Sequence, residues 1–197
     1  MEKHRIGPIN ALQKSLAENK IDEGICEKVL EGAWGIKPGC KPEKLAGWLF
    51  DSMARMDELL DDDAKRKVRE DCACCLGGRQ KKLCTETNKN RAAYEERIAA
   101  LNSGGLFGKG ERIKIVGPGK YEAIFQEDSQ PEKRCVCSNF RLNGLGKAWS
   151  KTYCLCCAGH VRRHMETALG KKLRVECVSS ALASMGKDNC RFRLSEV

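Results

Sequence analysis

The chain has 197 residues, of which 41% are hydrophobic and 32% are charged; this balance is typical of globular proteins and excludes a disordered chain. No stretch approaches the run of about 20 apolar residues that a membrane-spanning helix needs, and the N-terminus lacks the apolar core of a signal peptide. The net charge of +9 is compatible with a polyanionic partner. No interleaved aromatic residues or nucleic-acid motif accompany it, so we expect neither nucleic-acid nor membrane binding. We expect a cytoplasmic protein.

Periodic apolar residues, with proline, aspartate and glycine at their ends, predict helices in the first half of the chain. The clearest helix runs from Glu43 to Leu60, and Asp61 to Asp63 can cap the helix that follows. Gly77 and Gly78 are expected to break that second helix. Further helices are expected after Pro8, within residues 22–35 and within residues 88–104. The apolar residues expected to be buried in the clearest helix are Leu45, Leu49, Met53, Met56 and Leu60.

After residue 110 the pattern changes to strands. Apolar and polar residues alternate over 111–127 around Gly117, Pro118 and Gly119, which predicts a hairpin. A helix is expected from residue 153 to 169, followed by strands within residues 172–182 and 189–196. We therefore predict an α+β fold in which N-terminal helices pack on an antiparallel sheet formed mainly by the C-terminal half. The predicted parts, 1–110 and 111–197, are expected to form one compact unit.

The strongest chemical signal is the set of thirteen cysteines. In a reducing compartment such density indicates metal binding or catalysis more often than disulfides. Two segments resemble each other: CACCLGGR, which begins at Cys72, and CLCCAGHVR, which begins at Cys154. Residues three apart are neighbours on a helix, so Cys72 can pair with Cys75, and Cys154 with Cys157. If the two segments meet in space, these four thiolates suit zinc or an iron–sulfur cluster.

Further ligands are available nearby. Cys135 and Cys137 have the spacing that places two side chains on one face of a strand, so they form another candidate pair. Cys156, His160 and His164 fall on one helical stripe about 12 Å long, so at most two of them would share an ion. A solvated or hydrogen-bonded histidine pair is the plainer interpretation. The remaining cysteines considered are expected to be core or turn residues: Cys26, Cys40, Cys177 and Cys190.

The C-terminal segment also resembles a known family. The segment from Tyr153 to Leu194 resembles the end of the vinyl-reductase-type small-molecule-binding domain. It shares the entry YCxC with a group of bacterial proteins, some of which are named L-2-aminothiazoline-carboxylate hydrolase. This resemblance implies an α+β fold with a ligand pocket between helices and sheet, which relatives use to sense small molecules, sometimes through a metal. The matching residues are Gly159, Gly170, Val175, Glu176, Gly186, Cys190 and Phe192.

Two functions remain open. The first is a metal-binding protein, with zinc or an iron–sulfur cluster, that binds or senses a small ligand; a homodimer is compatible with it. The alternative is a hydrolase acting on a small sulfur and nitrogen heterocycle, with Cys156 as the nucleophile and His160 as the base. Under that alternative, Lys151 would help to lower the pKa of the thiol. Glu166 and Glu176 would be candidate acids.

Overall fold

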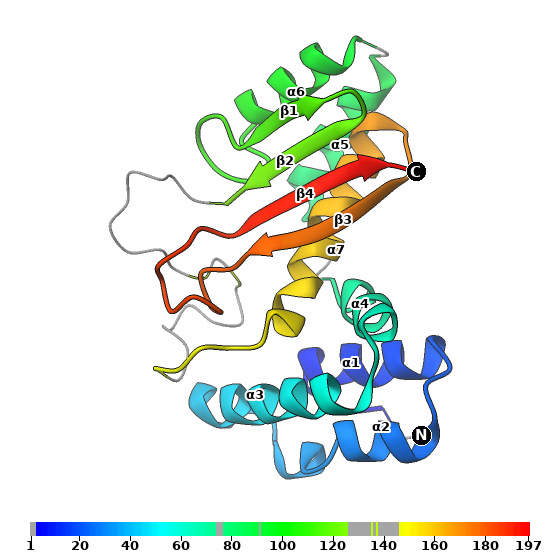
Figure 1. Ribbon diagram of the computed structural model, residues 1–197, viewed down its shortest axis with the longest axis vertical. Helices are drawn as coiled ribbons and strands as arrows, with labels where there is room; N and C mark the ends of the chain where they lie inside the picture. The colour runs from blue at the N-terminus through cyan, green and yellow to red at the C-terminus, as the bar shows by residue number, and fades with distance from the viewer. Residues whose placement is uncertain (1–2, 74–76, 91, 126–134, 136, 138–145) are drawn as a thin grey trace.

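The computed structural model describes residues 3–73, 77–90, 92–125, 135, 137 and 146–197. These residues form N-terminal helices, then two strands, a further helix and two more strands, and the expected α+β class is confirmed (Figure 1). The helices are α1 (Gly7–Glu18), α2 (Glu23–Val29), a short 3₁₀ helix (Ala33–Gly35), α3 (Pro42–Leu59), α4 (Asp62–Asp71), α5 (Gly78–Lys89), α6 (Tyr94–Ser103) and α7 (Lys151–Leu169). The strands are β1 (Ile113–Gly117), β2 (Lys120–Ile124), β3 (Leu173–Ser179) and β4 (Arg191–Glu196).

Local sequence signals explain where several helices begin. The Asp61 carboxylate accepts a hydrogen bond from the backbone N–H of Ala64 at 2.8 Å and caps α4. Prolines occupy the first turns of α1 and α3, where a missing N–H leaves no internal hydrogen bond unmade. In α3 the predicted core residues Leu49, Met53 and Met56 are buried, as is Leu60 beyond its end, whereas Leu45 is partly buried.

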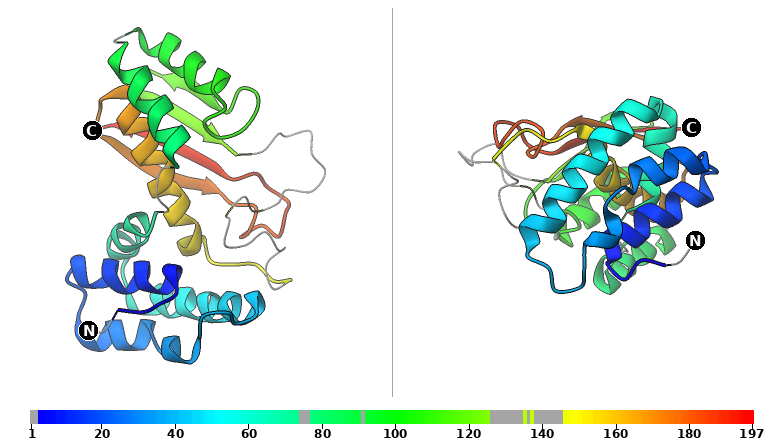
Figure 2. Two further views of the ribbon diagram at one scale, coloured as in Figure 1. Left: turned by 180° about the vertical axis from the view of Figure 1, so that it is seen from behind. Right: turned by 90° about the horizontal axis from the view of Figure 1, so that it is seen from below.

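The four strands form one antiparallel sheet in the order β1-β2-β4-β3. The expected hairpin is confirmed, with Gly119 at a φ of 62° in the turn between β1 and β2. Helices α5, α6 and α7 lie behind the sheet, so the opposite face carries no helix among the described residues (Figures 1 and 2). The short strand expected around Cys135 falls largely outside the described residues.

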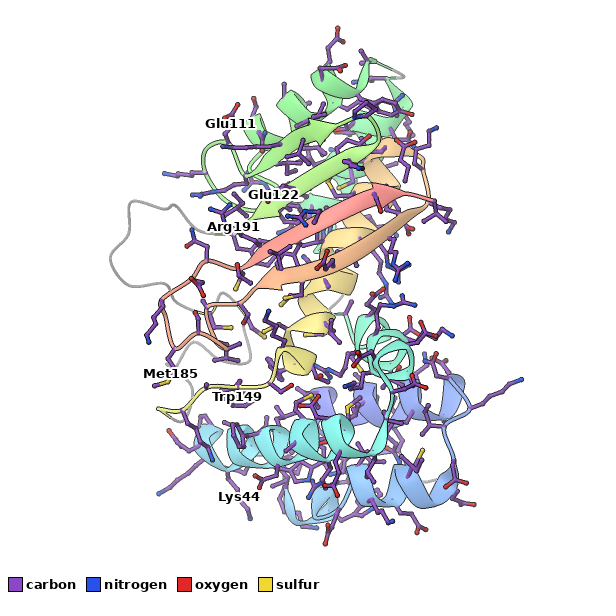
Figure 3. All side chains as sticks on the ribbon, viewed as in Figure 1. Lys44, Glu111, Glu122, Trp149, Met185 and Arg191 are labelled. Atoms are coloured by element: carbon purple, nitrogen blue, oxygen red, sulfur yellow. The ribbon has the colours of Figure 1, made fainter. Side chains whose placement is uncertain are left out.

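Helix α7 connects two groups of buried side chains. Its first turns contribute Tyr153 and Cys154 to a cluster formed mainly by α1 to α4, and the rest of the helix contributes Val161 and Met165 to a cluster beneath the sheet. Trp149, on the segment that leads into α7, packs edge-on against Phe50 of α3 (Figure 3). Helices α5 and α6 share their buried side chains with the sheet. The division of the chain at residue 110 remains a prediction.

No helix among the described residues combines the length and the hydropathy that crossing a bilayer requires.

Candidate functional site

The end of α4 is held tightly against α7. Gly159 faces the backbone of Glu70, and a Cβ atom added to Gly159 would lie 2.7 Å from the Cα of Glu70 and closer still to its carbonyl oxygen. The Glu70 carboxylate is buried and pairs with Arg162 of α7 at 2.9 Å. Only glycine permits this approach of two backbones. The contact places Cys72, two residues beyond Glu70, beside the first turns of α7.

Arg69 is the buried cation of this junction, with only 4% of its surface exposed. Its Nε donates to the carbonyl oxygen of Thr152 at 3.3 Å and its Nη2 donates to that of Tyr153 at 3.0 Å. Its guanidinium carbon lies 5.3 Å from the centre of the Tyr153 ring. Within the described part of the chain Arg69 has no salt bridge to a carboxylate, whereas its neighbour Arg66 pairs with Asp63. Burying a charge without a counter-charge costs free energy, so negative charge near Arg69 would stabilise the folded protein.

Thiols provide the electrostatic surroundings of Arg69. Burial alone would lower the pKa of the Arg69 guanidinium, but Cys156, Cys72, Tyr153 and Cys154 together raise it above its ordinary value. Burial raises the pKa of Cys72 and of Cys154, so Cys156 is the one of these three thiols whose pKa is lowered. Cys72 and Cys156 also interact with each other across the α4–α7 junction. The two cysteine-rich segments therefore lie side by side around one cation, as far as the structure describes them. Cys72 caps the C-terminus of α4, and its expected partner Cys75 lies outside the described residues.

Cys156 is the thiol whose environment most favours the charged form. A hydrogen bond from the Cys157 thiol lowers the pKa of Cys156, burial opposes this effect, and the Arg69 guanidinium lowers the pKa further. The same hydrogen bond raises the pKa of Cys157 well above its usual value, because Cys157 keeps the proton that it donates. Both side chains are half-buried on α7. Of the two, Cys156 is therefore the thiol that ionises more easily.

Cys135 and Cys137 lie close to the same turns of α7. The Cys137 sulfur is 3.5 Å from the phenolic oxygen of Tyr153. The two thiols hydrogen-bond to each other, which together with burial raises the pKa of Cys135. Cys137 also interacts electrostatically with Cys156 and Cys157. This candidate pair thus joins the sulfur atoms around α7, several of which are visible in Figure 3.

Cys154 points toward the connection between β3 and β4. Its sulfur lies 2.9 Å from the Ser180 hydroxyl oxygen, and burial raises the pKa of the thiol. Cys177 and Cys190 raise the pKa of Cys154 further through electrostatic repulsion. Cys177, which is expected to be a core or turn residue, is partly buried and packs against both buried clusters, in agreement with that expectation. Cys154 and Cys157 therefore lie one turn apart on α7, as expected. The Cys154 thiol, however, is hydrogen-bonded to Ser180 beside the sheet.

The sulfur atoms of the described cysteines do not form a complete metal site. Among the residues that the structure describes, no three His, Cys, Asp or Glu side chains are arranged to hold one ion. The donor set itself fits a soft metal, because thiolates are the preferred ligands of zinc and iron–sulfur clusters. Arg69 also fits such a site, because thiols lose their protons when they bind a metal and the buried guanidinium would offset the negative charge. Cys72, Cys137 and Cys157 each interact electrostatically with Cys156, so these four thiols share one environment.

The rings of the two histidines of α7 are in contact, at an interplanar angle of 56°. Their ring centres are 4.2 Å apart, and Nδ1 of His164 lies 2.9 Å from the backbone oxygen of His160. His164 is fully buried against Phe107, and this burial lowers the pKa of His164 to about 4. His164 is therefore neutral at physiological pH. The groups that lower the pKa of Cys156 are Cys157 and Arg69, so the assignment of His160 as a base remains a prediction.

The two candidate acids have other partners. Glu166 accepts a hydrogen bond from the backbone N–H of Leu173 at 3.0 Å, which ties α7 to β3. Glu176 is exposed and lies 3.9 Å from Arg193 on the open face of the sheet. Lys151 donates to the carbonyl oxygen of Val178 at 3.2 Å.

Sequence reasoning missed Arg69. Its helix, α4, carries four basic residues within five positions, Lys65, Arg66, Lys67 and Arg69, and nothing in that run marks one as buried. The one usable signal is spacing, because Arg69 precedes Cys72 by three residues and therefore shares its helical face.

Cys156 is expected to be the thiol that reacts fastest with iodoacetamide at pH 7 in chelator-treated protein, because only the thiolate attacks. Peptide mapping by mass spectrometry measures this. Cys157→Ala removes the hydrogen-bond donor and should move the pH midpoint of Cys156 alkylation upward, whereas Cys40→Ser should leave it unchanged. Equal labelling of Cys156 and Cys40 at pH 7 would contradict the described electrostatics.

Comparison with known proteins gives no match: no family model, no curated protein and no solved structure is similar to the chain. The resemblance to the vinyl-reductase-type domain therefore remains a prediction.

Proposed function

We propose that this protein binds a soft metal centre, zinc or an iron–sulfur cluster, through thiolates from the end of α4, the first turns of α7 and the residues Cys135 and Cys137. The observation that carries the proposal is Arg69: a buried guanidinium, without a carboxylate partner in the described chain, surrounded by Cys72, Cys154 and Cys156. A metal held by four thiolates has a net negative charge, which would compensate this cation.

The position of the thiols suggests how such a centre would act. It would join α4 to α7 at the point where the N-terminal helices meet the helix beneath the sheet. Loading, loss or oxidation of the metal would then change the packing of these two parts. We therefore propose a sensor or small-ligand-binding role in a reducing, cytoplasmic setting, where dense cysteines serve metal binding more often than disulfides.

Metal analysis tests the proposal. Protein purified without oxygen is expected to contain zinc, or iron with sulfide and a brown colour. Cys72→Ser and Cys156→Ser, from the two different segments, should each lose most of the bound metal. Cys40→Ser is the matched control, because Cys40 is half-buried before α3 and should leave the metal content unchanged. An unchanged metal content in both test variants would refute a site shared by the two segments.

The second candidate is a thiol-dependent hydrolase, and the observation that favours it is the lowered pKa of Cys156. In this role the Cys156 thiolate would attack an electrophilic carbon of a small heterocycle such as a thiazoline, as the family resemblance implies. Chelation separates the two candidates, since a catalytic thiol keeps its activity without metal whereas a metal centre that supports folding does not.

A further inference from the structure

A groove lies between α4, the first turns of α7 and strands β2 to β4. Its volume is about 580 Å³, which falls in the range of small-molecule sites. A smaller hollow beside it shares two of its lining residues, Arg66 and Arg174. The face of the sheet opposite the helices carries charged side chains, among them the labelled, half-buried pair Glu122 and Arg191 (Figure 3).

Strand register sorts these charges into rows. Lys120 of β2 lies opposite Ser195 of β4, which lies opposite Arg174 of β3. This row carries two cations and one hydroxyl group and no carboxylate. The next row on the same face places Arg193 between two carboxylates, so it has no excess of positive charge. Of these two rows, only the first carries a net positive charge.

The rest of the lining does not neutralise that charge. The two carboxylates in the groove already have partners, because Asp62 pairs with Lys65 at 2.8 Å and Glu176 with Arg193. Within the described residues, neither Arg174 nor Lys120 has a carboxylate at salt-bridge distance. Lys151, at the first position of α7, adds a further cation to the lining.

We propose that this groove binds a small organic anion. Its phosphate or carboxylate group lies against Lys120, Ser195 and Arg174, and its apolar part lies against Leu155. A guanidinium matches the oxygens of either anion with two parallel hydrogen bonds, and the serine hydroxyl adds a third donor. The inference rests on the ligand-binding half of the proposed function and is independent of the metal.

The groove also borders the thiols. Cys177 lines it and interacts electrostatically with Cys156, while Leu155 separates Cys154 from Cys156 on α7. A ligand in the groove would therefore touch residues adjacent to the candidate metal ligands.

Calorimetric titration of the full-length, metal-containing protein with phenyl phosphate tests the proposal, and phthalate in a parallel titration distinguishes a phosphate from a carboxylate preference. Arg174→Gln and Lys120→Gln should each weaken binding of the preferred probe by about tenfold, the expected loss for a charge-assisted hydrogen bond. Arg5→Gln removes the same charge from an exposed position on the N-terminal segment and should leave binding unchanged.

Failure to bind either probe at millimolar concentration, or equal weakening in Arg174→Gln and Arg5→Gln, would overturn the inference. Metal content is measured on the same samples and is expected to stay unchanged in all three variants. If the purified protein contains metal but binds neither probe, the anion-binding groove alone is refuted. If the purified protein contains no metal but binds phenyl phosphate through Arg174, the metal centre alone is refuted.

Discussion

Gly159→Ala is expected to lower the free energy of unfolding by about 3 kcal/mol, because the new methyl group would overlap backbone atoms of Glu70 that cannot move aside like a side chain. Separation of α4 from α7 would also weaken the buried pair of Glu70 with Arg162. Urea unfolding followed by circular dichroism measures the effect.

Gly47→Ala is the matched control. Gly47 lies inside α3, and a Cβ atom added there meets nothing within 4 Å. Because alanine is a better helix former than glycine, this variant should gain up to about 1 kcal/mol of stability. If Gly159→Ala were as stable as Gly47→Ala, the close approach of α4 and α7, and with it the convergence of the cysteine segments, would be wrong.

Arg69→Met is expected to lower the free energy of unfolding by about 2 kcal/mol, because the carbonyl oxygens of Thr152 and Tyr153 would lose a charged, buried donor. The Cys156 thiol would also lose the guanidinium that helps to lower its pKa. The variant should also bind less metal, and its Cys156 alkylation should need a higher pH. Urea unfolding, metal analysis and peptide mapping give the three measurements.

Two variants control this experiment. Arg69→Lys keeps the charge and should restore part of the metal binding, although lysine cannot donate in the same fork. Lys67→Met removes an exposed cation of the same helix that pairs with Asp63, and it should cost less than about 1 kcal/mol. If Arg69→Met were as stable as the parent protein and bound as much metal, Arg69 would be an ordinary packing residue. The proposal that its charge compensates a metal–thiolate centre would then be wrong.

The sequence predicts the secondary structure well because the relevant signals are local. The period of apolar residues in α3, the aspartate cap of α4 and the glycine turn between β1 and β2 each act within a few residues. They identify elements without fixing their mutual placement. The α+β class followed from the order of these elements along the chain.

The arrangement of the thiols could not be predicted, because it depends on how α4 crosses α7. The contact that sets this crossing joins Gly159 to Glu70, and Arg69 reaches Thr152 across 83 positions of sequence. Helical spacing placed Cys154 and Cys157 together, but it did not show that Cys154 bonds to Ser180 while Cys156 lies next to Cys157 and Arg69. Long-range packing decided which sulfur atoms share an environment.

X-ray absorption spectroscopy of the metal-loaded protein tests the central proposal most directly, since it reports the atoms bound to the metal. We predict a shell dominated by sulfur, at about 2.3 Å if the metal is zinc, that loses sulfur in both Cys72→Ser and Cys156→Ser. A shell of nitrogen and oxygen, or one unchanged in both variants, would contradict a thiolate centre shared by α4 and α7.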